Sequence, residues 1–252
     1  MTKTLGLIGS GMIGGMLARL AVAAGLDVVL SNSRGPQTLA DLVGELGPQA
    51  RAATPAEAAR AGDLVVATIP LGAYDRLPAD ALAGRTVIDT MNYYPERDGA
   101  IAGLDTREAT SSALVQRHLV DSRVVKACNN IFFFSLLTAA RPAGSPDRSA
   151  LPIAGDDPAA KAEVAELLDA LGYDTVDIGT LADSWRSEPG TPVYVRPYFP
   201  GRPPFGASQE VFQRWFRESP APAVSAARVK ELTALALRDH AGERLPGTLT
   251  SD

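Results

Sequence analysis

A glycine-rich turn near the start of the chain constrains the fold more than any other feature. The apolar run Leu5–Ile8 leads into Gly9-Ser10-Gly11-Met12-Ile13-Gly14, and a small-residue helix follows. A second apolar strand is predicted at Val28–Leu30. A strand, glycine turn, helix and strand within about thirty residues are the context of a dinucleotide-binding fingerprint. The sequence therefore predicts that the chain begins with a nucleotide-binding βαβ unit.

The three glycines of this motif have different expected roles. Gly9 permits the tight turn, and Gly14 lets the helix pack closely on the strand. Gly11 lets the backbone amides approach a pyrophosphate, to which the helix N-terminus also offers free N–H groups and its positive dipole end.

The end of the second predicted strand indicates which dinucleotide binds. An NAD site typically has an acidic residue about twenty positions after the glycines, which binds the ribose 2′-hydroxyl. That place holds Asn32, Ser33 and Arg34, whereas the nearest acid, Asp27, lies at the opposite end of the strand. A hydroxyl and a guanidinium suit a 2′-phosphate, so we expect NADP(H) rather than NAD(H). The alternative is that Arg34 is a solvated loop residue.

Composition narrows the class of protein. The chain has 252 residues, 46% of them apolar, and a net charge of −5. No apolar run approaches the ~18 residues of a membrane helix, no secretory segment precedes the first strand, and the charge argues against nucleic acid as a partner. The single cysteine, Cys128, has no partner for a disulfide or metal site. We expect a cytoplasmic protein that binds a small molecule and no metal.

Apolar strands and helices alternate along the first 180 residues. This pattern predicts an α/β fold, a Rossmann-type doubly wound and mainly parallel sheet. Further strands are expected at residues 50–53, 63–70, 86–89, 122–127, 151–155 and 175–178. Because proline cannot donate to a ladder, Pro152 is expected at a sheet edge or a strand start.

The composition changes after residue 180. Six prolines lie between residues 188 and 204 among Tyr194, Tyr198 and Phe199, which excludes a long helix or a central strand there. Helices are expected at about 209–217 and 225–240. We therefore predict an NADP-binding Rossmann domain over residues 1–180 and a small C-terminal domain over residues 181–252, with the proline–aromatic segment and helices.

Ligands of open α/β sheets bind outside the carboxyl ends of the strands, where strand order reverses. The residues that follow the predicted strands are therefore candidates for cofactor binding. They are Gly9, Ser10, Gly11, Met12, Ile13, Asn32, Ser33, Arg34, Pro70, Leu71, Asn92, Ala127 and Asn129. Pro70 and Leu71 are expected beside a ribose, and Asn92 near the nicotinamide carboxamide. For Asn92 and Asn129 the alternative is that each caps a turn.

The sequence offers few acid–base groups, and we assign no catalytic residue. It has only two histidines, His118 and His240, each expected to be a surface or packing residue. Lys126 lies inside a strand and could point either way. Such scarcity fits a hydride transfer between two bound rings, which depends on stacking geometry more than on a proton donor.

Taken in order, these motifs resemble the NADPH-dependent reductases of coenzyme F420, a deazaflavin. The resemblance covers roughly residues 4–194, through LGLIGSGMIG, NSRGP, VVATIPLGAYD, VIDTMNYY, RVVKACNNI, LPIAGDD, LGYDTVDIG and SWRSEPGTPVY. It implies a Rossmann domain, a small helical C-terminal domain, a homodimer, and reversible hydride transfer between NADP(H) and F420.

Carried over by position, the resemblance implies a pyrophosphate loop at residues 10–13 and a 2′-phosphate site at Ser33 and Arg34. It places Leu71 after the fourth strand and Ala127 where the sixth strand meets the nicotinamide. The family often has a second basic residue after the Ser-Arg pair, where this chain has Gln37 and Thr38.

Two other functions stay open from the sequence. One is an NADPH-dependent reductase of a small carbonyl or imine, in which Tyr194 or Tyr198 supplies the proton. The other is a module that senses NADP(H) without catalysis, which a Rossmann fold alone does not exclude. Phe132, Phe133 and Phe134 either stack on a deazaflavin or belong to the core.

Overall fold

The computed structural model describes residues 3–201, 206 and 208–238. The strands within them are β1 (Thr4–Ile8), β2 (Asp27–Ser31), β3 (Ala50–Ala52), β4 (Leu64–Ala67), β5 (Thr86–Asp89), β6 (Arg123–Lys126), β7 (Ala150–Gly155) and β8 (Asp174–Asp177). The longer helices are α1 (Met12–Ala23), α2 (Ala40–Leu46), α3 (Pro55–Ala61), α7 (Ser111–His118), α8 (Phe133–Thr138), α9 (Pro158–Ala170), α10 (Gln209–Glu218) and α11 (Ala226–Ala234).

Short helical segments complete the described elements. They are α4 (Ala79–Leu82), α5 (Pro95–Asp98), α6 (Ala102–Asp105), and the 3₁₀ segments η1 (Pro36–Leu39), η2 (Leu71–Arg76), η3 (Leu181–Ser187) and η4 (Arg196–Tyr198).

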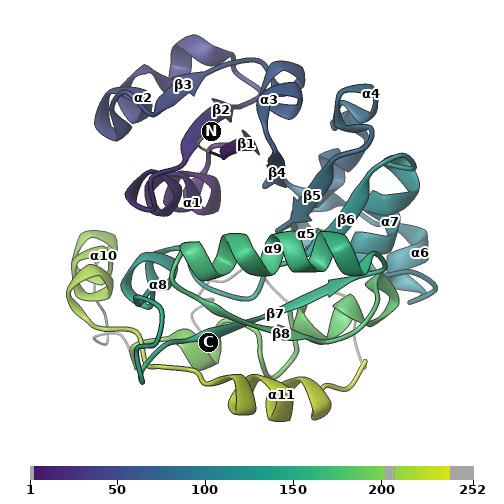
Figure 1. Cartoon of the computed structure of the whole chain (residues 1–252). Coiled ribbons are helices and arrows are strands. Elements are labelled where there is room, and N and C mark those ends of the chain that lie inside the picture. The colour runs from purple at the N-terminus through teal and green to yellow at the C-terminus, as the bar shows by residue number, and fades with distance from the viewer. Residues whose placement is uncertain (1–2, 202–205, 207, 239–252) are drawn as a thin grey trace.

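The described strands form one sheet in the order β3-β2-β1-β4-β5-β6-β7-β8 (Figure 1). All neighbours from β3 to β6 are parallel, β7 runs antiparallel to β6, and β8 is parallel to β7. The order 3-2-1-4-5-6 is that of a dinucleotide-binding sheet, with its switch point between β1 and β4. The predicted Rossmann-type, mainly parallel fold is confirmed.

Alternating residues of the central strands enter two separate cores. Val66, Ile88 and Val125 belong to a core shared with α1 and α9. Their neighbours Val65, Val87 and Val124 belong to a second core with α4 and α7. Because successive side chains of a strand point to opposite faces, this division shows that both faces of the sheet are covered, as a doubly wound fold requires.

Local capping signals in the sequence place several helices. The Thr54 side chain accepts from the Glu57 N–H while Glu57 accepts from the Thr54 N–H, which makes a capping box at the start of α3. Asp157 accepts from the Ala160 N–H at 2.8 Å and caps α9. The expected final helix over 225–240 is shorter, since α11 ends at Ala234, and residues 239–252 lie outside the described part.

The prediction that Pro152 lies at an edge or strand start holds only locally. Pro152 is the third residue of β7, and β8 lies beyond β7 at the edge of the sheet. Proline is tolerated there because β6 pairs only with Ala154 and Gly155 of β7. The Ala150 N–H, earlier in β7, donates to the Val224 carbonyl at 2.8 Å instead.

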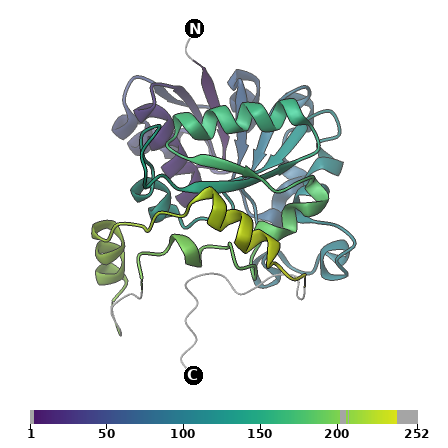
Figure 2. The same cartoon turned by 60° about the horizontal axis from the view of Figure 1, so that its bottom comes forward.

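The C-terminal elements pack on the β7–β8 end of the sheet. Helix α9 contacts one side of this pair of strands and α11 also contacts both strands, below them in Figure 1. Figure 2 shows α10 and α11, in yellow-green, at the same end of the molecule. Val229 and Leu232 of α11 join the core that contains α1 and α9. The division into two domains at residue 180 stays a prediction.

Candidate dinucleotide and substrate site

Two glycines of the turn between β1 and α1 are required by the fold itself. Gly9 has a φ of +104°, and a Cβ there would lie 2.3 Å from the Thr68 carbonyl oxygen. A Cβ on Gly14 would lie 2.2 Å from the Gly9 carbonyl oxygen. Real contacts do not come so close, so no other residue fits either position without backbone movement. Their roles as turn and packing glycines agree with the prediction.

Gly11 is different because nothing in the protein requires it to be glycine. Its φ is −79°, which any residue adopts, and a Cβ added there would meet no atom within 4 Å. Gly11 is exposed, and the neighbouring Met12 side chain is 65% exposed. The open space over this turn therefore lets a ligand reach the backbone at the N-terminus of α1, as a pyrophosphate would need.

Hydrogen bonds join this turn to the end of β2. The Ser10 hydroxyl and the Gly9 N–H both donate to the Ser31 carbonyl, at 3.0 Å. The Ser31 hydroxyl in turn donates to the Leu7 carbonyl at 2.8 Å. Ile13 is half-buried and packs against the core. The structure thus brings the predicted pyrophosphate loop and the predicted 2′-phosphate loop together at the switch point.

Asn32 shapes the loop that presents Arg34. Its Oδ1 accepts from the Arg34 N–H at 3.0 Å, and its Nδ2 donates to the Thr38 hydroxyl at 2.8 Å. Thr38 is itself bonded to the Gly35 carbonyl. Ser33 and Arg34 are exposed, and no partner of the Arg34 guanidinium is found among the described residues. Asn32 therefore positions the loop, and Arg34 has its donors free for an anion.

The other predicted site residues lie further along the same edge. Pro70 is exposed, whereas Leu71 and Ala127 are both 0% exposed and belong to the two cores. Asn92 and Asn129 are buried and bond to each other: Asn92 Nδ2 donates to the Asn129 carbonyl at 2.8 Å, and Asn129 Nδ2 to Asn92 Oδ1 at 3.0 Å. Their contact with a cofactor stays a prediction, and this mutual bonding supports the structural alternative.

A segment from the C-terminal part covers the carboxyl ends of β5 and β6. We call residues 187–198 the strap. Asn129 Nδ2 donates to the Ser187 carbonyl at 2.8 Å, and the Val195 N–H donates to the Asn130 carbonyl at 2.8 Å. Tyr194 shares a hydroxyl–hydroxyl hydrogen bond with Tyr94, which follows β5. The strap therefore spans the two strand ends beside the switch point.

Half-exposed aromatic rings continue this surface onto α8 and α10. Neighbouring ring centroids lie 4.2 to 6.1 Å apart. The half-exposed members are Phe132, Phe133, Phe134, Phe199, Phe212 and Trp215, around the buried Phe216. Phe132 also packs against Tyr94, Tyr194 and Val195. The sequence left open whether residues 132–134 stack on a ligand or form core, and their partial exposure leaves both roles available.

Sequence reasoning missed a buried ion network beneath the strap. Lys126, whose side chain is 1% exposed, lies 3.4 Å from Asp89 Oδ2 and 3.9 Å from Glu188 Oε1. Its ammonium group also donates to the Ser111 hydroxyl at 3.0 Å and to the Met91 carbonyl. The available signal was a charged residue at the end of each of two apolar strands, Asp89 in β5 and Lys126 in β6. That signal does not reveal Glu188.

The described acid–base groups near the site are held in structural bonds. Tyr198 donates to the Ala150 carbonyl at 2.8 Å, and burial raises its pKa well above the ordinary value for tyrosine. Burial likewise raises the pKa of the Cys128 thiol to about 12. His118 bonds to the Leu77 carbonyl at 2.9 Å and packs on Tyr74, and His240 lies outside the described residues. Of the two predicted proton donors, only Tyr194 therefore stays a candidate.

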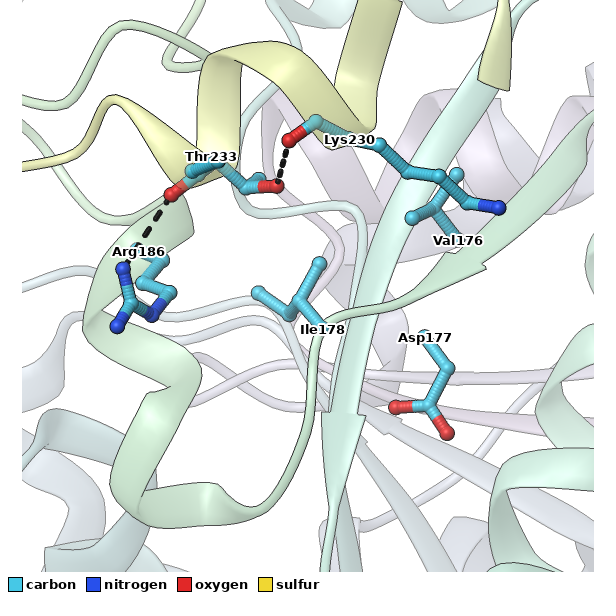
Figure 3. A pocket seen from close by; sticks show the side chains of 7 residues that line it. Val176, Asp177, Ile178, Arg186, Lys230 and Thr233 are labelled. Atoms are coloured by element: carbon cyan, nitrogen blue, oxygen red, sulfur yellow. Dashed lines mark hydrogen bonds between the residues drawn. The ribbon is translucent and has the colours of Figure 1, made fainter. Parts of the chain in front are cut away.

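A cavity of about 430 Å³ lies away from this edge, against β8 and α11 (Figure 3). Arg186 and Lys230 line it, and Arg186 donates to the Thr233 carbonyl at 3.4 Å. No predicted site residue borders it. Within the described ranges, no cluster of His, Cys, Asp or Glu side chains could hold a metal ion. No described helix is long and apolar enough to cross a membrane.

Comparisons with known proteins agree with this geometry. Residues 4–93 match the family model described as NADP oxidoreductase coenzyme F420-dependent. The solved structure of the hypothetical protein SMa0349 from Sinorhizobium meliloti is similar with a TM-score of 0.67 and 27% identity, covering 77% of this chain and 93% of that one. A proposed F420-dependent NADP reductase from Arthrobacter sp. FB24 has a TM-score of 0.62 and 25% identity, with coverages of 73% and 87%.

A curated relative shares only the N-terminal part. The Escherichia coli (strain K12) protein YjhV is 45% identical over 53 residues, which are 21% of this chain and 39% of that protein. The chain therefore matches well under two thirds of YjhV.

Proposed function

We propose that this chain, whose residues 4–93 match the family model of coenzyme F420-dependent NADP oxidoreductases, transfers a hydride between NADP(H) and a deazaflavin such as F420. The family match and the similar reductase structure support an NADP-dependent oxidoreductase. The acceptor, the site residues, a homodimeric state and a cytoplasmic location are parts of the proposal.

The open space at Gly11 is the observation that most directly supports the proposed dinucleotide site. A Cβ there would meet no protein atom within 4 Å, whereas one on Gly9 or Gly14 would collide with the backbone. A glycine that the fold does not require, at an exposed helix N-terminus beside the switch point, is explained by a ligand that comes close to the backbone. The pyrophosphate of NADP(H) is that ligand in the proposal.

Preference for NADP(H) rests on the loop after β2. Asn32 fixes the loop through its bonds with Arg34 N–H and Thr38, which leaves the Arg34 guanidinium exposed. A guanidinium offers a planar fork of donors and a permanent charge to a 2′-phosphate. No described acidic residue is available there for a 2′-hydroxyl, since Asp27 starts β2 at its other end.

The residues at the carboxyl ends of the strands fit hydride transfer better than proton transfer. When bound, NADP(H) supplies a hydride or takes one up. The chain's own contribution is to bind the cofactor at the turn, to keep Asn92 and Asn129 fixed to each other, and to cover the ends of β5 and β6 with the strap. A hydride passes between two rings held at contact distance, so positioning supplies most of the catalysis.

The test is to mix the protein with NADPH and F420 and to follow the absorbance of the deazaflavin. We expect F420 to bleach with a rate proportional to enzyme concentration, and NADPH to be consumed in equal amount. Flavin mononucleotide and a small cyclic imine serve as alternative acceptors under the same conditions. The proposal is wrong if F420 stays unreduced at high enzyme concentration.

The strongest competing function is reduction of a small carbonyl or imine. The Tyr94–Tyr194 hydroxyl pair favours it, since such a substrate needs a proton donor. Faster NADPH oxidation with the imine than with F420, abolished in Tyr194→Phe, would establish that function. NADPH binding without turnover of any acceptor would instead identify a sensing module.

A further inference from the structure

The strap is held by buried polar contacts along its whole length. At its start, the Glu188 carboxylate accepts from the Ser111 hydroxyl and lies 3.9 Å from the Lys126 ammonium group. In its middle, Asn130 Nδ2 donates to the Val193 carbonyl at 3.2 Å. At its end, the Ser135 hydroxyl donates to the Tyr198 carbonyl at 2.8 Å. These contacts join residues more than sixty positions apart in the sequence.

The backbone of the strap is strained where it meets the β6 end. Val195 has a φ of +57°, and the Arg196 N–H bonds to the Tyr194 carbonyl across it at 2.6 Å, which is a tight γ-turn. A β-branched residue is unfavourable at positive φ. Cys128, at the end of β6, also has a positive φ, of 56°. Such strain persists only where contacts with the surrounding structure hold the backbone in the strained conformation. Strained residues are concentrated at ligand-binding sites.

The Lys126 network fixes the start of the strap. The ammonium group has three N–H donors, and three acceptors surround it: Met91 O, Ser111 Oγ at 3.0 Å and Asp89 Oδ2 at 3.4 Å. Asp89 is fully buried, and it also accepts from the Ser112 hydroxyl at 2.6 Å and from the Met91 N–H at 2.8 Å. Glu188, with 17% of its side chain exposed, is the member contributed by the strap.

We propose that the strap is the fixed wall of the second-substrate pocket, and that Glu188 is its positioning residue. Glu188 ties the first turn of the strap to β6 and α7. That attachment sets where Tyr194 and Val195 lie over the ends of β5 and β6, between the dinucleotide turn and the aromatic rings of α8. The substrate is a planar ring, and the half-exposed Phe132, which packs against Tyr194 and Val195, continues this wall toward Phe133. This inference rests on the proposed hydride transfer.

The test compares Glu188→Gln and Glu188→Ala with the wild-type protein. Gln keeps an acceptor for the Ser111 hydroxyl but removes the charge facing Lys126, whereas Ala removes both. We expect the KM for F420 to rise about 10-fold in Glu188→Ala and less in Glu188→Gln, since small displacements of bound groups cost rate steeply. The Kd for NADPH, from fluorescence titration, is expected to stay unchanged because Glu188 lies away from the glycine turn.

Asp177→Asn is the matched control. It removes a more exposed ion pair, with Lys161 at 2.7 Å, on β8 and away from the strap. We expect neither KM nor Kd to change in this variant. A merely structural role for Glu188 would lower the melting temperature and leave the KM for F420 unaltered, which overturns the positioning role.

Amide hydrogen exchange of residues 187–198 separates this inference from the proposed function, because it needs no acceptor. We expect faster exchange there in Glu188→Ala, with unchanged exchange in α1. Unchanged exchange in the strap would refute the inference even if the enzyme reduces F420. Failure of wild-type protein to reduce any planar acceptor refutes the proposed function and, with it, the substrate assigned to this wall.

Discussion

Two neighbouring side chains after β2 have separate tasks. Asn32 uses both its amide groups within the loop, on the Arg34 N–H and the Thr38 hydroxyl. Arg34 is exposed, and its backbone carbonyl accepts from Gln37 Nε2 at 3.3 Å. Gln37 thus braces the loop where relatives often carry a second basic residue. In the proposed site, Arg34 therefore supplies the charge that binds the 2′-phosphate.

Arg34→Ala is expected to weaken NADPH binding about 10- to 100-fold, the worth of hydrogen bonds to a charged group, and NADH binding hardly at all. Fluorescence titration of both nucleotides measures the difference. Arg117→Ala, which removes an exposed arginine from α7, controls for net charge. Equal losses of affinity for NADPH and NADH would show that Arg34 does not bind the 2′-phosphate.

At the scale of elements, Asp98 joins the short helical segments α5 and η2. Its carboxylate accepts from the Tyr94 N–H at 2.9 Å and from the Gly72 N–H at 3.2 Å, and pairs with Arg97 at 2.8 Å. Burial alone would raise the pKa of Asp98, but these hydrogen bonds outweigh it and hold the pKa below its ordinary value of 3.8. The charged form is therefore the one that the fold stabilises.

This pKa fixes the direction of a pH effect. Because the pKa is lower in the folded state, the contribution of Asp98 to stability is fully present above pH 3.8 and is lost as the pH falls below it. Asp98→Asn is expected to lower the free energy of unfolding by about 1–3 kcal/mol at neutral pH, because its amide nitrogen would face a backbone N–H donor. The loss of stability is expected to be smaller in acid. Thermal unfolding across pH measures it. A destabilisation independent of pH would contradict the role given to the charge.

Elements with local signals were predictable from the sequence, and contacts between distant residues were not. The Thr54–Glu57 box and the Asp157 cap span three residues, so the pattern itself reveals them. Lys126 could have pointed to either face, because a strand of valines is buried on both. Its partner Glu188 lies 62 positions away, in a proline-rich segment with no periodicity, and only the folded chain brings the two together.

At the scale of the whole molecule, the described surface carries a cluster of half-exposed aromatic rings. The half-exposed rings form one cluster over α8, α10 and the residue after the strap: Phe132, Phe133, Phe134, Phe199, Phe212 and Trp215. Patches of this kind mark ligand or protein contacts. Both roles are compatible with the homodimer that the family resemblance implies.

Sedimentation equilibrium tests that state. We expect a mass of twice the 26.4 kDa chain mass at micromolar concentration. Trp215→Ser, which places a polar side chain in the patch, is expected to shift the protein toward monomer if the patch lies in the dimer contact. A single species of one chain mass across the concentration range would contradict the dimer.

We propose that the dinucleotide lies at the switch point between β1 and β4, with the strap beside it over β5 and β6. Gly11 tests this placement directly, because a side chain there has free space in the protein but would occupy the position of the pyrophosphate. Gly44→Ala is the matched control, since Gly44 in α2 also has no atom within 4 Å of an added Cβ and lies away from the turn.

The decisive measurement is an equilibrium titration of NADPH into wild-type protein, Gly11→Val and Gly44→Ala, with thermal unfolding of all three. We predict that Gly11→Val folds like the wild type but binds NADPH about 10- to 100-fold more weakly, from overpacking of about 1–3 kcal/mol against the ligand. Gly44→Ala is expected to bind NADPH normally. Unaltered NADPH affinity in a folded Gly11→Val protein would contradict the placement of the dinucleotide at this turn.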